Sequence, residues 1–425
     1  MNWIKISLLL CSFGFLKEFR PGEAFITEYL TSWKNLTSTQ VIEDVYPLAT
    51  YSNLINTIVM LLLTDFLRYK PIIILCGLSG IIIYLLLTFT NQLITMKLFE
   101  FGFGLYLSTD IAYYTYIYAK VEREHYQKVS SYTRSAFLFG RFISSSLSQT
   151  LITFNLLNYH QLNYLTIGGQ IAATISALLL PNVEQSIYFH PKLDVPLTNR
   201  YDKIKKAYQM LWNDFIKAFT NRHVLKWSLW WAAANCGYVQ VLIYSQALWQ
   251  TAVKNDQQLY NGLVEALYSI IGAIAVFFVG MLKLNWSSVG EIILALFTWI
   301  ESIILFVISS NYNLWFLYVL YIIFGVIYHA IATIASSEVA KKISRDSYGL
   351  IFGIVLIISL AMESILTFFI ATGNVFELNI RQQFTIYAGY FGVFAMIFTI
   401  ISIFKIIKKI KNGEEIKIWI DNDTN

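Results

Sequence analysis

The sequence is poor in charge, in proline and in cysteine. Only 13% of the 425 residues are charged, about half the proportion in an average soluble domain. This scarcity excludes a disordered chain, a coiled coil and an ordinary soluble enzyme. Six prolines and 21 glycines are too few for a collagen-like or linker-rich protein. Cys11, Cys76 and Cys236 lie far apart in apolar runs, so they predict structural thiols and neither a metal site nor a disulfide framework.

Sequence motifs for catalysis are also missing. The chain contains no P-loop, no HExxH, no GxSxG and no paired set of histidines and cysteines. These absences predict a protein that is not an enzyme, needs no cofactor or metal, and does not use ATP directly.

Long apolar runs are what the sequence has in abundance. Hydrophobic residues make up 56% of the chain, and the mean hydropathy is +0.56. Since one membrane-spanning helix needs about 20 apolar residues, the chain has room for twelve with short loops. We therefore predict an all-α membrane protein that crosses the bilayer twelve times, at 4–31, 46–67, 71–90, 97–119, 130–155, 161–181, 224–250, 259–281, 287–309, 313–339, 348–371 and 381–406.

The basic residues gather on one side of these spans. If the N terminus is cytoplasmic, most of the 31 lysines and arginines fall in cytoplasmic loops or tails, as the positive-inside rule requires. Lys34, Lys97, Lys254 and Arg381 fall outside. The net charge of +5 thus reports topology and gives no reason to expect a nucleic-acid partner. Asn35 begins an Asn-Leu-Thr glycosylation acceptor in the first outside loop, which predicts a glycoprotein.

The longest polar stretch divides the spans into two groups of six. We predict an N-terminal bundle (1–181), a cytoplasmic linker (182–223), a C-terminal bundle (224–408) and a cytoplasmic tail (409–425). Six plus six spans around such a linker, with an Asp/Arg-bearing turn at 64–70, are typical of the major facilitator fold. No cleavage site follows the first apolar run, which we expect to be a helix broken near Pro21 and Gly22.

Ionisable residues within spans are costly, about 2.5–3.5 kcal/mol each on insertion scales, so those present indicate pairing or function. Asp110 is the strongest candidate. Tyr106, Tyr113 and Tyr114 share its face on a continuous helix, and a carboxylate among aromatic rings suits an organic cation. The alternative is an ion pair of Asp110 with a basic residue on a neighbouring helix; Arg134 and Arg141 are the obvious choices.

Glu23 and Glu363 are the next candidates. Glu23 follows the expected helix break, where freed backbone groups commonly line a cavity, unless it pairs with Lys17 or Arg20. Glu363 has no basic residue within one helical turn, which favours a cavity-facing role. The remaining ionisable candidates within the spans are less specific: Glu100, which Lys97 could pair, Glu265, Glu301 and His329.

Several segments in consistent order resemble solute carrier family 19, the reduced folate and thiamine carriers. They are RPGEAFITEYL (20–30), YPLATYS (46–52), TDFLRYKPIIIL (64–75), DIAYYTYIY (110–118), EHYQKVSSYTRS (124–135), WSLWW (227–231), YNGLVEA (260–266) and LIFG (350–353). This resemblance implies a major facilitator fold and the carriage of a water-soluble vitamin across the plasma membrane.

Three positions of that resemblance bear on the substrate. Folate carriers have arginine where Asp110 stands, another arginine at Gly325 and lysine at Glu363; thiamine carriers have glutamate, lysine and glutamine. The missing cations disfavour the dianionic folates and favour thiamine, whose thiazolium is permanently charged. The resemblance further assigns Glu23, Asp110 and Tyr113 to thiamine binding, Tyr46 to stacking on the substrate, and Tyr244 and Gln246 to the lining of the site.

The predicted function is therefore thiamine transport by alternating access in the plasma membrane, with both termini cytoplasmic. Exchange for protons is a natural coupling, because an empty buried carboxylate tends to take up a proton. One alternative is a reduced folate exchanger, in which Arg134, Arg141 and His329 would supply the positive site. Another is a membrane receptor that does not transport.

Overall fold

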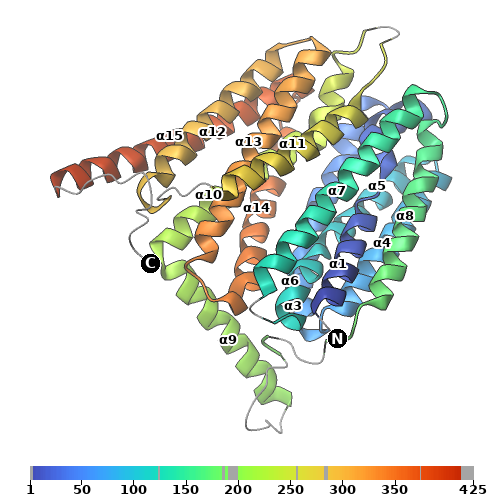
Figure 1. Cartoon of the computed structure of the whole chain (residues 1–425). Helices are drawn as coiled ribbons and strands as arrows, with labels where there is room; N and C mark the ends of the chain where they lie inside the picture. Colours follow the sequence, from blue (N-terminus) through green and yellow to red (C-terminus); the bar gives the residue numbers. More distant parts are fainter. Residues whose placement is uncertain are drawn as a thin grey trace.

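A computed structural model of the chain describes residues 3–122, 125–183, 187–189, 200–254, 257–281, 286–373 and 375–412. The elements assigned within them are all helical (Figure 1). The first part of the chain contains α1 (Trp3–Lys17), η1 (Pro21–Phe25), α2 (Ile26–Glu28), η2 (Tyr29–Trp33), η3 (Gln40–Val45), α3 (Tyr46–Phe66), α4 (Lys70–Phe89), α5 (Leu93–Ser108), α6 (Asp110–Lys120), α7 (Tyr126–Thr153) and α8 (Tyr159–Leu179). The remainder contains α9 (Arg200–Thr220), α10 (Arg222–Gln250), α11 (Asn261–Met281), α12 (Trp286–Ser310), α13 (Leu314–Ala340), η5 (Arg345–Ser347), α14 (Tyr348–Ile370) and α15 (Ile380–Lys411).

Each of the twelve predicted spans has a helical counterpart in this series. Eight helices of the described residues are long and apolar enough to cross a bilayer. The predicted first span is broken as expected: α1 ends at Lys17, and η1 starts at Pro21. Gly22 lets this break approach α8, since its N–H donates to Thr166 Oγ1 at 3.1 Å and a Cβ at this position would collide with Asn163.

A second break, which the sequence pattern did not predict, interrupts the fourth span. Helix α5 ends at Ser108 and α6 begins at Asp110, with Thr109 between them. Asp110 therefore stands in the first turn of a helix, in the interior of a predicted span. Side chains bond the backbone carbonyls at both breaks: that of Lys17 accepts from Tyr106 and Gln170, and that of Tyr106 accepts from the Thr109 hydroxyl.

The helices form two groups, α1–α8 and α10–α15, joined by the segment that contains α9 (Figure 1). We call the end of the bundle that holds the N terminus and α9 the linker end, and the opposite end the far end. Helix α1 packs against α7 and α8 of its own group. Between the groups, α3 packs against α14 and α7 packs against α11.

Hydrogen bonds between the two groups gather in the far half of the molecule. Gln250 on α10 donates to Glu28 at 2.9 Å and to Thr31 at 3.0 Å. Gln149 on α7 accepts from the N–H of Leu263 and donates to the carbonyl of Leu259, which precedes α11. The far end of the interface is therefore closed in this conformation.

The predicted turn at 64–70 anchors the linker. The Asp65 carboxylate accepts hydrogen bonds from the backbone N–H groups of Ile187, Tyr188 and Phe189, at 2.8–3.0 Å, and from the Tyr69 hydroxyl at 2.6 Å. The Tyr188 hydroxyl then donates to Asp214 on α9 at 3.0 Å. The chain leaving α8 is thus fixed to the end of α3 before it reaches α9.

Candidate functional site

Asp110 forms an ion pair with Lys17. The Lys17 ammonium lies 2.6 Å from one Asp110 oxygen and donates to the other at 2.8 Å. Lys17 is only 1% exposed, whereas 22% of the Asp110 side chain is exposed. The partner is therefore the last residue of α1, rather than Arg134 or Arg141 as considered from the sequence.

Glu23 belongs to a second set of charges beside this pair. Arg20 contacts Glu23 at 2.9 Å and donates to both oxygens of Glu18, at 2.9 and 3.0 Å. Lys17, Glu18 and Arg20 are buried, while 38% of the Glu23 side chain is exposed. We call these five residues, Lys17, Glu18, Arg20, Glu23 and Asp110, the charge cluster; it holds one more acidic than basic side chain. Its two partly exposed members are both carboxylates.

Tyr113 lies three residues after Asp110 on α6, and both side chains contact α1. Its hydroxyl donates to the carbonyl of Leu10 at 3.0 Å, and its ring packs on Phe13. Asp110 and Tyr113 therefore share the side of α6 that faces α1, as their spacing predicts, and the Tyr113 hydroxyl is bonded within the protein. Tyr106, on the other side of the break, contacts Lys17, whose ammonium lies 4.9 Å from the ring centroid.

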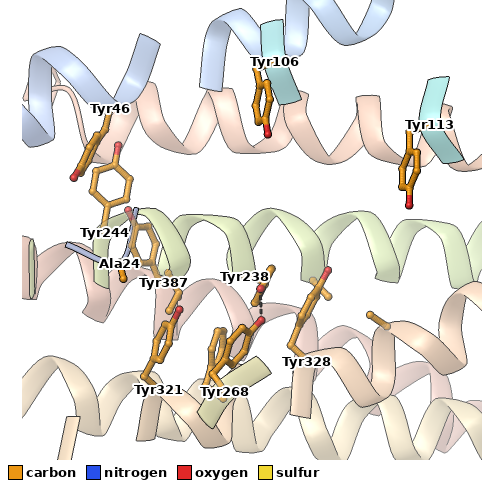
Figure 2. Packing of buried hydrophobic residues seen from close by; sticks show 14 of the residues in the cluster. Ala24, Tyr46, Tyr106, Tyr113, Tyr238, Tyr244, Tyr268, Tyr321, Tyr328 and Tyr387 are labelled. Carbon is orange, nitrogen blue, oxygen red and sulfur yellow. Dashed lines mark hydrogen bonds between the residues drawn. The ribbon is translucent and has the colours of Figure 1, made fainter. Parts of the chain in front are cut away.

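Tyr46, Tyr244 and Glu363 meet where α3, α10 and α14 come together. The Tyr46 and Tyr244 rings lie edge to face with centroids 6.0 Å apart (Figure 2). Glu363, 1% exposed, accepts a hydrogen bond from Thr50 on α3 at 3.0 Å. Among the described residues, no basic side chain forms an ion pair with this carboxylate, and its second oxygen lacks a hydrogen-bond partner.

Unpaired hydroxyl groups accompany that carboxylate. The buried Oη atoms of Tyr51 and Tyr244 likewise have no partner within the described parts of the chain. Buried polar groups in proteins are nearly always hydrogen-bonded, so unpaired ones point to a bound ligand or water. We call the set Tyr46, Thr50, Tyr51, Tyr244 and Glu363 the aromatic cluster.

Gln246 connects the broken first span to α10. Its side-chain amide donates to the carbonyl of Glu23 at 3.1 Å and accepts from the N–H of Thr27 at 3.2 Å. Thr27 in turn hydrogen-bonds the Tyr46 hydroxyl at 2.6 Å. Five of the residues predicted for the substrate site, Glu23, Tyr46, Tyr244, Gln246 and Glu363, therefore lie at the interface between the two groups.

Two of the three basic side chains considered for an anion site, those of Arg141 and His329, already bond other protein groups. Arg141 contacts Glu265 on α11 at 3.0 Å and lies over the Tyr268 ring. His329 hydrogen-bonds the Tyr268 hydroxyl. Arg134 is exposed on α7.

Position 325, where the carriers of the resembling family have a basic residue, has no room for a side chain in this structure. A Cβ added there would collide with the ring of Tyr268, whose hydroxyl bonds Tyr238 (Figure 2). An aromatic ring therefore fills the space next to α13 where a side chain at 325 would start.

Other predicted positions lie outside these clusters. Glu100 is buried, and its suggested partner Lys97 pairs with Asp44 instead. Glu301 is fully buried on α12, and both of its carboxylate oxygens lack a partner in the described residues. Asn35 is exposed in the turn after η2. From the sequence, Lys17 was expected only as a candidate partner of Glu23, and Thr50 was not expected at all. The position of Lys17 at the end of the first apolar run was the available signal.

Comparisons with solved structures define the class of protein. The fold matches a nucleoside transporter, NupG, with a TM-score of 0.61, 14% identity, and coverage of 94% of this chain and 98% of that one. A D-xylose–proton symporter matches with a TM-score of 0.63, 12% identity, and coverage of 94% and 97%. The protein therefore has the all-α major facilitator fold. The sequence relatives described next show that it is a membrane transporter and not an enzyme.

Sequence comparisons identify the family. Residues 1–386 match the family described as reduced folate carrier, and the chain belongs to it. It is 35% identical to thiamine transporter 1 of Homo sapiens over 92% of this chain and 87% of the relative. It is also 35% identical to folate transporter 1 of Caenorhabditis elegans over 92% and 90%.

Proposed function

We propose that this protein carries thiamine, or a closely related organic cation, across the plasma membrane by alternating access. The observation that carries the proposal is the charge balance of the site. The charge cluster has an excess of one carboxylate, and the aromatic cluster contains Glu363 without a basic partner among the described residues. A monovalent organic cation would offset this surplus, whereas a dicarboxylate such as a reduced folate would increase it.

The aromatic side chains support the same substrate class. A thiazolium ring is stabilised by contact with aromatic faces and by a nearby carboxylate. Tyr46 and Tyr244 supply rings at the interface, while the unpaired hydroxyls of Tyr51 and Tyr244 and the free oxygen of Glu363 can bond an aminopyrimidine. We assign Glu23, Asp110, Tyr46, Tyr244, Gln246 and Glu363 to the substrate site. Tyr113, which bonds Leu10, acts through the packing of α1 on α6.

The transport cycle follows from where the two groups of helices meet. With the linker end cytoplasmic, the far-end hydrogen bonds of Gln246 and Gln250 close the outside. Rocking of the groups would break these bonds, open the site to the outside and admit the cation. Return of the empty carrier would be assisted by protonation of its surplus carboxylates, which gives exchange of thiamine for protons.

Labelled thiamine uptake in cells that express the protein tests this proposal. We expect saturable uptake that excess unlabelled folate does not reduce and that an outward proton gradient accelerates. Uptake of folate but not thiamine would refute the proposal and favour the anion exchanger, with Arg134 as its exposed cation. Saturable binding to sealed vesicles without accumulation would instead indicate a receptor.

Glu363→Gln provides the site-specific test. Thiamine carriers that this chain resembles have glutamine at this position, so the variant tests whether this chain depends on its additional carboxylate. The amide keeps the hydrogen bond from Thr50 but removes the negative charge, and thiamine uptake should fall at least about tenfold, which corresponds to about 1.4 kcal/mol of lost interaction. Glu301→Gln is the matched control, since it neutralises a buried carboxylate of the same helical group outside the proposed site. Equal uptake by both variants, at equal surface expression, would show that Glu363 does not contribute to cation binding.

A further inference from the structure

Helix α9 is held against the transporter by one of its faces. Ala207 and Ala218 are buried and Leu211 and Asp214 are half-buried, at spacings of three or four residues that place them on the same side. Asp214 accepts hydrogen bonds from Tyr188 at 3.0 Å and from Ser347, just before α14, at 2.8 Å. These contacts fix the rotation of α9 about its own axis.

The neighbouring face of α9 is apolar and uncovered. Ile204, Tyr208, Trp212 and Ile216 follow one another at intervals of four residues, and their exposed fractions are 42%, 49%, 61% and 45%. We call these four residues the α9 stripe. The Trp212 ring also stacks on Phe215, with centroids 5.4 Å apart. Contiguous apolar surface of this kind on a folded protein marks an interaction site.

The third face of α9 is polar and basic. Lys206, Gln209, Asn213 and Lys217 are exposed there. Residues 200–220 contain five basic and two acidic residues, and Asp214 is one of those two. The helix therefore combines an exposed apolar stripe with a positive charge, which are the two properties of helices that lie in a membrane interface.

Helix α9 ends close to the start of a predicted membrane span. Helix α10 begins at Arg222, two residues after α9 ends at Thr220, so the end of α9 is at the level where a membrane helix starts. In Figure 1, α9 crosses the linker end at a large angle to the helices that it joins. A helix so placed runs alongside the lipid headgroups rather than through the bilayer.

We propose that the α9 stripe inserts among the lipids of the leaflet at the linker end and that the adjacent lysines bind acidic headgroups. Tyrosine and tryptophan favour the boundary between headgroups and acyl chains, and lysines near a leaflet rich in phosphatidylserine are attracted to it. The charge part of this inference uses the proposed cytoplasmic location of the linker end; the apolar part requires only the bilayer itself. Neither part depends on the identity of the transported substrate.

Lipid contact can be measured residue by residue on the full-length protein. Cys11 is first replaced by serine, while Cys76 and Cys236 can stay because they are buried. A single new cysteine, Ile216→Cys or Asn213→Cys, is then labelled with the environment-sensitive fluorophore NBD. The protein is reconstituted in vesicles of phosphatidylcholine, with or without phosphatidylserine. We expect a blue-shifted emission that brominated lipids quench for the Ile216 label, and water-like emission without quenching for the Asn213 label on the polar face.

The contribution of the α9 lysines is measured by comparing vesicles with and without phosphatidylserine. Phosphatidylserine should increase quenching of the Ile216 label, and Lys206→Gln with Lys217→Gln should abolish that increase. Water-like emission from both labels would overturn the proposal. A blue shift that brominated lipids do not quench and that grows with protein density would also overturn it, because the label would then contact a second copy of the protein. A blue shift that appears only when a soluble protein is added would overturn it as well. Monodisperse elution and retained substrate uptake establish that the labelled variants are folded.

Discussion

Removing the negative charge of Asp110 should destabilise the protein and abolish transport for two separable reasons. In Asp110→Asn, the carboxylate that contacts the buried Lys17 ammonium at 2.6 and 2.8 Å becomes a neutral amide, and Glu18 at 3.6 Å is the remaining negative neighbour. Breaking a buried ion pair in this way costs about 3–5 kcal/mol, and because one carboxylate remains, the expected cost is about 3 kcal/mol. Asp110 would also no longer offer a negative charge to a cationic substrate.

A double variant separates these effects. Lys17→Met combined with Asp110→Asn removes both charges, and replacing a whole buried pair with neutral side chains is often close to neutral for stability. We expect the midpoint of thermal inactivation of the solubilised protein to fall in Asp110→Asn and to recover largely in the double variant. Thiamine uptake, corrected for surface expression, should stay low in both.

The double variant can also refute the reasoning. If its uptake returns together with its stability, Asp110 acts only as the partner of Lys17, and the cation must bind elsewhere. Asp44→Asn with Lys97→Met is the matched control, because that pair, 2.8 Å apart, lies outside the site and is more exposed. This control should change neither property.

Three further predictions follow from close contacts. Gly325→Ala should lower stability by about 1–3 kcal/mol in a thermal melting assay, because the new methyl group overlaps an aromatic ring. Gly168→Ala, whose methyl group meets nothing within 4 Å, should have little effect in that assay. Asp65→Asn should cost about 1–3 kcal/mol by weakening the bonds to the N–H groups of 187–189, detected as faster proteolysis of the linker. Gln246→Ala removes two hydrogen bonds between the helical groups, so labelling of a far-end cysteine by an impermeant thiol reagent should increase while uptake falls.

The membrane-spanning architecture could be predicted from the sequence because each span is a long apolar run with charged ends. Helix α9 could not be found in this way, since it lies in the longest polar stretch. Its signal was the recurrence of Ile204, Tyr208, Trp212 and Ile216 every four residues, a period that a search for uninterrupted hydrophobic segments ignores.

The site was only partly accessible to sequence reasoning. The pairing of Lys17 with Asp110 joins α1 to α6, and no spacing along the chain reveals which of several basic residues reaches a carboxylate. The break at Thr109 was equally hidden, because it separates Tyr106 on α5 from Asp110 on α6 with no glycine or proline at the break to mark it. Gln246, at the interface of the two groups, was assigned by family resemblance alone, whereas the helix break near Pro21 and Gly22 also pointed to Glu23.

The two hydrogen bonds that converge on one oxygen of Asp214 have a mechanical consequence. Tyr188 is fixed through its backbone to the end of α3, and Ser347 precedes α14, so α9 is held from both moving groups at a single point. When the linker end widens or narrows during transport, one of these bonds must break or α9 must shift with one group. A distance probe between α9 and either group would therefore follow each turnover in real time, without any alteration of the residues that bind the substrate.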